Sequence, residues 1–202
     1  MTLAETISSI IAFIALIISG VTAYLTLFAR FKGIFSPKRR VILTQINGVP
    51  YVVLECEFRN EGAKHGSIED LMLKVTHPET GSEFNFAPQF IKLQFNIFDR
   101  YNITDFLIFS GVALGTKERR EMYIAFRPLL PQFSPPVGLV KLHASAKVNG
   151  QTNWLNSTEP ISLRLSDDIN KKWISLPPIG EAQQLEAIEI GISRQSLLEK
   201  KK

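Results

Sequence analysis

The chain has 202 residues, of which 45% are hydrophobic and 21% are charged, and its formal net charge is +4. This size leaves room for one ordinary globular domain with shorter flanking segments. Beyond residue 40 the charges are mixed in sign and scattered, unlike the footprint of a nucleic-acid-binding protein. The single cysteine, Cys56, excludes an intramolecular disulfide framework and fits a reducing compartment.

An uncharged, mostly apolar run occupies residues 6–28. Its length of about 22 residues is enough to cross a hydrocarbon core of ~30 Å as a helix. The alternative is a cleaved secretory signal, which has a basic start, a shorter apolar stretch and a small-residue cleavage site. Here the start carries Glu5 and no basic side chain, and no pair of small residues ends the run. We therefore predict a short flank over residues 1–5 and a retained transmembrane helix over residues 6–29.

Small and hydroxyl side chains recur along this run at alternating steps of four and three, which places them on one stripe of the helix. Such a stripe lets two transmembrane helices approach closely and hydrogen-bond across their contact. It indicates a homodimer through the helix, although these residue types are also common in helices without a partner. The stripe consists of Ser8, Ala12, Ala15, Ser19, Thr22 and Thr26.

Five basic residues follow the apolar run, whereas its N-terminal side offers only Glu5 and the α-amine. The cytoplasmic flank of a transmembrane helix usually carries the excess of Lys and Arg. Basic residues there also attract anionic headgroups, at about 1 kcal/mol each. We therefore predict a basic juxtamembrane linker over residues 30–40 and a cytoplasmic domain behind it. The topology and lipid-contact charges are Arg30, Lys32, Lys38, Arg39 and Arg40.

Short apolar segments broken by turn residues fill residues 41–167. Within one of them Leu54, Cys56 and Phe58 alternate with charged residues. A period of two indicates a strand with one buried face and one wet face. About seven such strands without long helices between them predict an all-β domain, an antiparallel immunoglobulin-like sandwich.

The turns between these strands carry their own signals. Asn47-Gly48 and Asn149-Gly150 are typical two-residue hairpin turns. His77-Pro78-Glu79-Thr80-Gly81 predicts a longer turn. The alternation slips at Glu69-Asp70, which indicates a β-bulge.

Two segments of the β region resemble a known class of module. Residues 58–71 contain Phe-x-Asn-x-Gly followed by Gly-x-Ile-x-x-Leu, which resembles a hairpin of immunoglobulin-like β-sandwich modules in prokaryotic envelope proteins and small single-pass membrane-anchored proteins. Residues 112–126 contain a turn followed by an apolar strand that runs into Phe-Arg-Pro, and they are similar to the penultimate strands of such modules. The disulfide pair and core tryptophan spacing of antibody domains are absent. The resemblance implies a binding or spacer module and brings no catalytic residues with it.

Between Phe84 and Phe109 lie seven of the chain's 14 phenylalanines. They either fill the space between two sheets or form an aromatic surface for a partner protein or the membrane interface. For an exposed surface, the candidate partner contacts are Phe90, Phe95 and Phe98.

A search for catalytic or metal-binding motifs finds none that recurs in known sites. A metal site could be drawn from His65, Asp70 and His77, but their spacing matches no ligand pattern, so both histidines are interpreted as surface loop residues. Cys56 falls on the apolar side of its strand, where a thiol acts as a small hydrophobe. Asp167-Asp168 fits a helix start or a solvated turn. We therefore assign no catalytic residue, metal or cofactor.

The tail, residues 168–202, differs in composition from the rest. The prolines near its middle predict an extended linker over residues 171–180, because proline restricts itself and its predecessor. Residues 181–202 predict a short helix, since acidic residues come early and basic residues late, in agreement with the helix dipole.

These expectations favour a membrane-tethered, non-catalytic interaction or scaffold module that binds a partner protein at the membrane surface, without nucleic acid. Two alternatives stay open: a small membrane-anchored enzyme with a site built from loop residues, and an envelope-facing adhesion or assembly module. A pocket that gathers ionisable side chains with perturbed pKa values would favour the enzyme.

Overall fold

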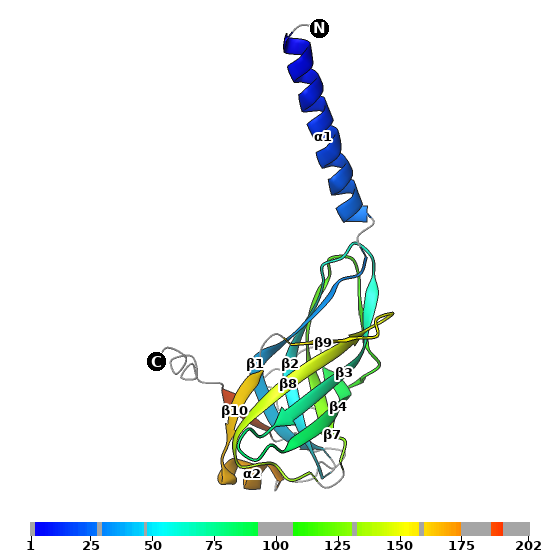
Figure 1. Ribbon diagram of the computed structural model, residues 1–202. Helices are drawn as coiled ribbons and strands as arrows, with labels where there is room; N and C mark the ends of the chain where they lie inside the picture. Colours follow the sequence, from blue (N-terminus) through cyan, green and yellow to red (C-terminus); the bar gives the residue numbers. More distant parts are fainter. Residues whose placement is uncertain are drawn as a thin grey trace, which may run out of the picture.

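The computed structural model describes residues 3–27, 30–46, 48–92, 107–130, 133–157, 160–174 and 187–191. In these residues one long helix, α1 (Leu3–Leu27), leaves one end of a body made of eleven strands and a short helix, α2 (Asp167–Ile174) (Figure 1). The strands are β1 (Gly33–Ile46), β2 (Val49–Asn60), β3 (Gly66–Thr76), β4 (Glu83–Lys92), β5 (Leu107–Ile108), β6 (Val112–Leu114), β7 (Arg119–Pro128), β8 (Gly138–Val148), β9 (Trp154–Asn156), β10 (Ile161–Leu165) and β11 (Ala187–Gly191).

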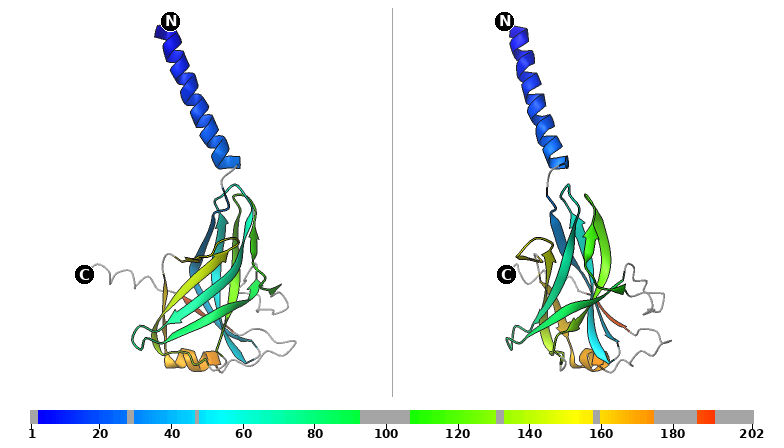
Figure 2. Two further views of the ribbon diagram at one scale, coloured as in Figure 1. Left: turned by 45° about the vertical axis from the view of Figure 1, so that its right-hand side comes forward. Right: turned by 90° about the vertical axis from the view of Figure 1, so that its right-hand side faces the viewer.

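The strands form one sheet in the order β10-β8-β3-β4-β7-β2-β1-β11, with β5, β6 and β9 added to β4, β3 and β8. Every described pairing is antiparallel. The sheet curls into a nearly closed barrel, which α2 covers at the end opposite α1 (Figure 2). The predicted all-β, antiparallel class is therefore confirmed. The prediction of about seven strands in two packed sheets differs from the structure, because the eleven described strands belong to one hydrogen-bonded sheet.

β-Bulges give the long strands their curvature. Register shifts occur between Pro37 and Val41, between Ile68 and Asp70, and between Pro88 and Phe90. A bulge bends its strand and increases the local twist, which is what the curled sheet requires. The bulge expected from the slipped alternation in β3 is confirmed.

The expected turns are also confirmed. Ile46 pairs with Val49, so two residues connect β1 to β2, and Gly48 has a φ of 77°. After β8, Gln151 N–H donates to the Val148 carbonyl (3.0 Å) around Asn149-Gly150, and Gly150 has a φ of 74°, in the left-handed region that glycine tolerates best. The turn is present, but the connection from Val148 to Trp154 is longer than the predicted two-residue hairpin. Thr76 pairs with Glu83 across the longer turn.

The interior is filled by the side chains that alternation assigned to it. Leu54, Cys56 and Phe58 are fully buried, whereas the intervening residues of β2 are half-buried or exposed. A cavity of ≈ 10 Å³ lies near α2, lined by apolar side chains that include Trp173 and Phe133. A volume of about 10–15 Å³ holds a single water at most. This part of the barrel is therefore a packed core and has no room for an organic ligand.

β1 begins at Gly33, so most of the predicted juxtamembrane linker over residues 30–40 belongs to the sheet. The run Ser-Pro-Lys-Arg-Arg looks like a linker because proline and consecutive bases are rare in central strands. Pro37 is accommodated because β11 covers β1 only from Arg40 to Thr44, which leaves the earlier part of that strand edge without a described partner. The bulge then places residues 38–40 opposite the single residue Glu55.

The predictions for the tail are wrong at two places. Residues 167–174 form α2, in which the hydroxyl of Ser166 accepts a hydrogen bond from the Ile169 N–H (3.2 Å). The expected helix start at Asp167-Asp168 is therefore confirmed, whereas residues 171–174 are helical and not the predicted extended linker, and residues 175–180 lie outside the described part. Residues 187–191 form β11 instead of part of a helix. Ile188 pairs with Leu43 and Ile190 with Val41, so the apolar alternation of this segment belongs to a strand. The other residues of 181–202 lie outside the described part.

In α1, the stretch Thr6–Leu25 is apolar and long enough to cross a membrane, and none of it is buried against the barrel. All six members of the predicted stripe, from Ser8 to Thr26, lie on this helix, and only the side chain of Thr26 falls outside the described part. The Thr22 hydroxyl donates to the Ile18 carbonyl (2.8 Å) within the helix itself. Association through the stripe stays a prediction.

Candidate functional site

Three segments meet at the end of the barrel from which α1 leaves: residues 30–32, the loop of residues 60–66 between β2 and β3, and the loop of residues 115–118 between β6 and β7. We call this region the collar. It connects the apolar helix to the sheet, so its construction decides how the helix and the barrel are joined.

The side chain of Asn60 holds the collar together from a buried position, with 1% of its surface exposed. Its Oδ1 accepts from the backbone N–H groups of Lys32 (3.3 Å) and Gly62 (2.8 Å). Its Nδ2 donates to the carbonyls of Lys64 (2.8 Å) and Gly115 (2.7 Å). The amide thus uses both donors and both acceptor positions, and it contacts all three segments. A buried amide satisfied in this way fixes geometry, because each lost bond would leave a buried group without a partner.

Backbone hydrogen bonds reinforce this arrangement. Asn60 N–H donates to the Glu118 carbonyl (2.8 Å), and Glu61 N–H donates to the Lys32 carbonyl (2.9 Å). The Thr116 hydroxyl donates to the Ala63 carbonyl (3.0 Å). The two loops and the chain that follows α1 are therefore bonded to one another directly as well as through Asn60.

Two glycines make the close approach possible. A Cβ on Gly62 would lie 2.0 Å from the Arg30 carbonyl oxygen, and a Cβ on Gly66 would lie 2.3 Å from the ring of Phe31. These are glycines of the motif that resembles an immunoglobulin-like hairpin. In this structure they leave room for residues 30–32, which is a steric reason for glycine at both positions.

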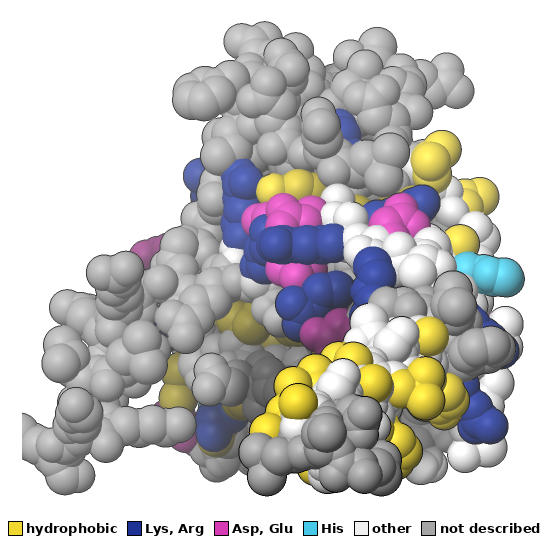
Figure 3. Space-filling view, turned by 90° about the horizontal axis from the view of Figure 1, so that it is seen from above, with side chains coloured by type: hydrophobic (Ala, Val, Ile, Leu, Met, Phe, Trp, Pro, Cys, Tyr) yellow, Lys and Arg dark blue, Asp and Glu magenta, His cyan; other side chains and the backbone are white. Residues whose placement is uncertain are grey.

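The acidic residues of the collar are each paired with a base. Glu61 bonds Lys32 Nζ (2.9 Å) and Arg59 (3.0 Å), and the hydrogen bond from Lys32 lowers the pKa of Glu61. The backbone N–H of Gly115 and then the side chain of Arg120 lower the pKa of Glu118. Seen from above, basic and acidic side chains lie next to one another on this part of the surface (Figure 3).

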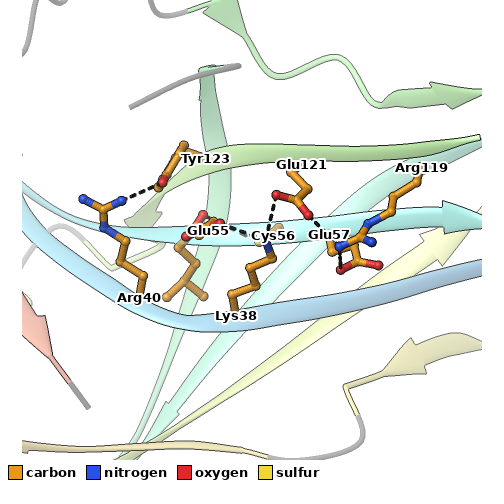
Figure 4. Close-up of polar contacts among 9 residues, drawn as sticks. Lys38, Arg40, Glu55, Cys56, Glu57, Arg119, Glu121 and Tyr123 are labelled. Atoms are coloured by element: carbon orange, nitrogen blue, oxygen red, sulfur yellow. Dashed lines mark hydrogen bonds and ion pairs between the residues drawn. The ribbon is translucent and has the colours of Figure 1, made fainter. Parts of the chain in front are cut away.

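A second polar group, which we call the ladder, runs across the outer face of β1, β2 and β7 (Figure 4). Lys38 Nζ contacts Glu55 (3.0 Å) and Glu121 (2.7 Å). Arg119 contacts Glu57 (2.9 Å) and Glu121 (2.7 Å). These pairs join three neighbouring strands along the sheet.

One end of the ladder is aromatic. Arg40 donates to the Tyr123 hydroxyl (2.9 Å), and its guanidinium carbon lies 5.7 Å from the centre of that ring. Burial raises the pKa of Tyr123, and the hydrogen bond with Glu121 raises the pKa of Lys38. The three bases and three acids of the ladder offset one another, and exposed pairs of this kind contribute about 0–1 kcal/mol each. The ladder stabilises strand register and presents no net charge to a partner.

The predicted lipid-contact charges are therefore split between two places. Arg30 and Lys32 lie in the collar, next to α1. Lys38 and Arg40 lie in the ladder, on the side of the barrel. The side chain of Arg39 is outside the described part.

The predicted aromatic contacts are described only at Phe90, since Phe95 and Phe98 lie outside the described residues. The Phe90 ring is half-buried on the outer face of β4, 5.9 Å from the ring of Tyr51. Phe86 is fully buried, and Phe84 and Phe109 pack against the same core. The core interpretation of this aromatic segment therefore holds for those three residues.

The histidines do not form a metal site. His65 and His77 flank β3, whose 11 residues separate them by about 35 Å at the usual rise of a strand. His65 is exposed, as expected for a loop residue. His77 is not a surface residue: it is 3% exposed, its Nδ1 accepts from Thr80 N–H (3.1 Å), and its Nε2 donates to the Val137 carbonyl (2.8 Å). Within the described ranges no three His, Cys, Asp or Glu residues are placed to hold a metal ion.

Cys56 is fully buried in β2, and burial raises the pKa of its thiol. A thiol that stays protonated and inaccessible is a poor nucleophile. The interpretation of Cys56 as a core residue is confirmed by its burial.

Sequence reasoning missed the collar. The Asn of the Phe-x-Asn-x-Gly motif was assigned no role of its own, although Asn-x-Gly followed by a second glycine is a signal for a tight loop with a bonded side chain. The bases Lys64 and Lys117 are far from α1 along the chain, and only the fold brings them near it.

No model of a known protein family matches this chain, and a search of curated proteins finds no match. The collar and the ladder are therefore interpreted from their own geometry.

Proposed function

We propose that this protein is a single-pass membrane protein whose barrel is a non-catalytic interaction or scaffold module, held at the cytoplasmic surface of the bilayer to bind a partner protein. The collar is the observation that supports this proposal most. Residues 30–32 begin three residues after the last residue of the apolar helix and are bonded into the barrel through Asn60. The barrel is therefore held close in the chain to the end of the helix.

The properties of α1 support membrane insertion. Its large apolar side chains point away from the barrel and are widely exposed, for example Leu16 at 70% and Phe13 at 63%. Exposed apolar surface costs about 25 cal/mol per Å² in water, and a bilayer removes that cost. A helix also satisfies its own backbone hydrogen bonds, which a membrane requires.

The charge flanking α1 supports the cytoplasmic side. Arg30 and Lys32 follow the apolar stretch Thr6–Leu25, whereas only Glu5 and the α-amine are charged on its N-terminal side. The positive-inside rule associates this distribution with a cytoplasmic C-terminal domain. Kinship with immunoglobulin-like modules stays a prediction.

An apolar surface supports the partner-binding role. In β5, Leu107 is 62% exposed and Ile108 is 77% exposed, and Ile108 pairs with Phe90 of β4. Exposed apolar residues grouped in this way are typical of protein interaction sites. Phe95 and Phe98 stay candidate contacts on the same part of the chain.

Membrane attachment is tested by alkaline carbonate extraction of the full-length protein from its native membrane. The anchor predicts that the chain stays in the membrane pellet. Release into the supernatant would contradict the proposal.

The side of the membrane is tested by thiol labelling of Glu79→Cys, at an exposed turn position, with a membrane-impermeant maleimide. The buried Cys56 gives the wild-type protein a silent background. Labelling only after permeabilisation supports a cytoplasmic barrel, whereas labelling of intact cells would place it on the outside and favour the envelope-facing alternative.

Partner binding is tested with a photo-crosslinking residue at Ile108, compared with the same residue at Glu79. The proposal predicts a protein adduct from position 108 in native membranes and none from position 79. Equal adducts at both positions would contradict a specific surface on β4 and β5.

A further inference from the structure

We propose that the collar binds the headgroups of anionic lipids through exposed basic side chains that two barrel loops bring to the bilayer. The contact is assigned to Lys64 and Lys117 together with Arg30, in place of the basic run at residues 38–40. The inference rests on the proposed function, because it requires α1 to lie in a membrane.

The collar fixes the positions of all three residues. The Lys64 carbonyl accepts from Asn60 Nδ2 (2.8 Å), and Lys117 Nζ donates to the Glu61 carbonyl. The backbone carbonyl of Arg30 lies against Gly62, and Arg30 is the third residue after Leu27, the last residue of α1. A basic side chain this close to the end of a membrane-spanning helix lies at the level of the lipid headgroups.

The charge of these three residues is available to a ligand. All three are exposed. The two collar acids bond other bases, Glu61 to Lys32 and Arg59, and Glu118 to Arg120. Among the ion pairs of the described residues, none includes Arg30, Lys64 or Lys117. Lys32 and, more weakly, Lys117 lower the pKa of Glu61, but the collar segments contain four bases and only two acids, so the end of the barrel that faces the bilayer keeps an excess of positive charge. The bases are Arg30, Lys32, Lys64 and Lys117, and the acids are Glu61 and Glu118.

The basic run at residues 38–40 is placed differently. Lys38 lies five residues beyond the start of β1 at Gly33, which is about 17 Å at the rise of a strand. Electrostatic interactions with headgroups are largely screened over such a distance, since the Debye length is about 10 Å at 0.1 M salt. Lys38 and Arg40 are also bonded to groups of the ladder.

The backbone conformation at Lys117 suits a substitution by glycine, which removes the charge of this residue. Its φ is 56°, in the left-handed region where glycine and asparagine are the usual residues. The backbone of this turn therefore does not favour lysine. Lys117→Gly removes the positive charge and relieves the backbone conformation at the same time, and thermal unfolding of the variant shows whether a loss of lipid binding accompanies a loss of stability.

The test uses the full-length protein in nanodiscs that contain zwitterionic phosphatidylcholine and anionic phosphatidylglycerol. After transfer to mild detergent, mass spectrometry measures the ratio of the two lipids that stay bound. The wild type is expected to retain phosphatidylglycerol above its share of the bilayer. The variant Lys64→Gln/Lys117→Gly is expected to lose about fivefold in this enrichment for each base removed. A control with the same charge change, Lys171→Gln/Lys172→Gln, alters α2 at the opposite end of the barrel and should match the wild type.

Three results would overturn the inference: unchanged enrichment in the collar variant, equal losses in the collar variant and the α2 control, or a comparable loss in Lys38→Gln/Arg40→Gln. The carbonate extraction separates this failure from that of the proposed function. A protein that stays in the membrane but shows no lipid enrichment contradicts only the headgroup site, whereas a protein released by carbonate contradicts the anchor. Thermal unfolding of the collar variant should show no decrease in Tm.

Discussion

The two ends of the barrel are closed by different chemistry. At the collar, the buried amide of Asn60 has four hydrogen-bond partners, all of them backbone groups. At the other end, α2 covers the core with Trp173, which is 1% exposed, lies 5.8 Å from the ring of Phe133 and donates to the Thr44 carbonyl (2.8 Å). The α2 end also has a buried amide, Asn170, whose Nδ2 is bonded but whose Oδ1 has no partner among the described residues.

The two ends of the barrel therefore serve different purposes: the collar positions the loops next to α1, and α2 stabilises the core. Hydrogen bonds between a side chain and several backbone groups fix the relative placement of loops, which an anchor requires. Aromatic packing contributes more stability but fixes direction less strictly. The end that joins the membrane helix is built from directional bonds, and the end that faces away from it is built from apolar area.

The largest effect is expected at the α2 end. Trp173→Ala should lower the free energy of unfolding by about 3–5 kcal/mol, because it removes a fully buried indole and leaves a cavity. Urea unfolding of the full-length protein in micelles, followed by far-UV circular dichroism, measures the loss. Trp173→Phe keeps most of the packing and should lose far less. A loss below about 1 kcal/mol for Trp173→Ala would show that α2 does not close the core.

The comparison of the two buried amides comes next. Asn60→Ala should cost about 2–3 kcal/mol, because two carbonyls and two N–H groups lose their partner. Asn170→Ala should lower the free energy of unfolding by only about 1 kcal/mol, because the Asn170 Oδ1 has no described partner. Removing this oxygen also removes the cost of burying it without a hydrogen bond. The same urea unfolding, followed by tryptophan fluorescence, compares them. Equal costs would contradict the special role of the collar amide.

A smaller and opposite effect is expected from Lys117→Gly in the collar. Relief of the left-handed backbone conformation should raise the free energy of unfolding by about 1–2 kcal/mol. The greater flexibility of glycine in the unfolded chain offsets part of this effect, so the expected net increase is about 0.5 kcal/mol. Lys117→Ala keeps the backbone cost and serves as the control. A less stable glycine variant would mean that the lysine side chain, and not the backbone, stabilises the turn.

The smallest effect is expected from the ladder, and it depends on pH. The hydrogen bond from Lys38 lowers the pKa of Glu121 below the usual 4.5, so this carboxylate contributes stability above pH 4.5 that is lost as the pH falls through its folded-state pKa. Lys38→Gln should therefore flatten the decrease in Tm between neutral pH and acid. Measurements at low and high salt provide the control, since exposed pairs are screened. An identical acid profile in the variant would remove the ladder as a contributor.

Much of the fold was accessible from local patterns in the sequence. The alternation around Cys56, the Asn-Gly turns and the slipped register at Glu69 each predicted a feature that the structure contains. Closure of the sheet was not accessible, because alternation shows that one face is buried but does not show whether a second sheet or the same sheet covers it. β11 was missed because its pairing depends on the open edge of β1, which is more than 140 residues earlier in the chain.

The candidate site was less accessible for the same reason. The bases nearest α1 in sequence were assigned to the membrane, yet a bulge takes Lys38 and Arg40 into the sheet beside acidic residues of β2 and β7. Lys64 is held by a hydrogen bond within its own loop, and Lys117 reaches that loop through a hydrogen bond from a second loop. Contacts of this kind depend on the folded arrangement, and a reading of neighbouring residues does not detect them.

The early start of β1 has a practical consequence for anyone who wishes to excise a water-soluble form of the head. Phe35 is part of the core, and residues 33–37 pair with β2, so trimming the chain at the apparent boundary near Val41 would delete half of an interior strand. A cut just before Arg30 would remove the apolar helix α1 and leave every hydrogen-bond partner of Asn60 in place.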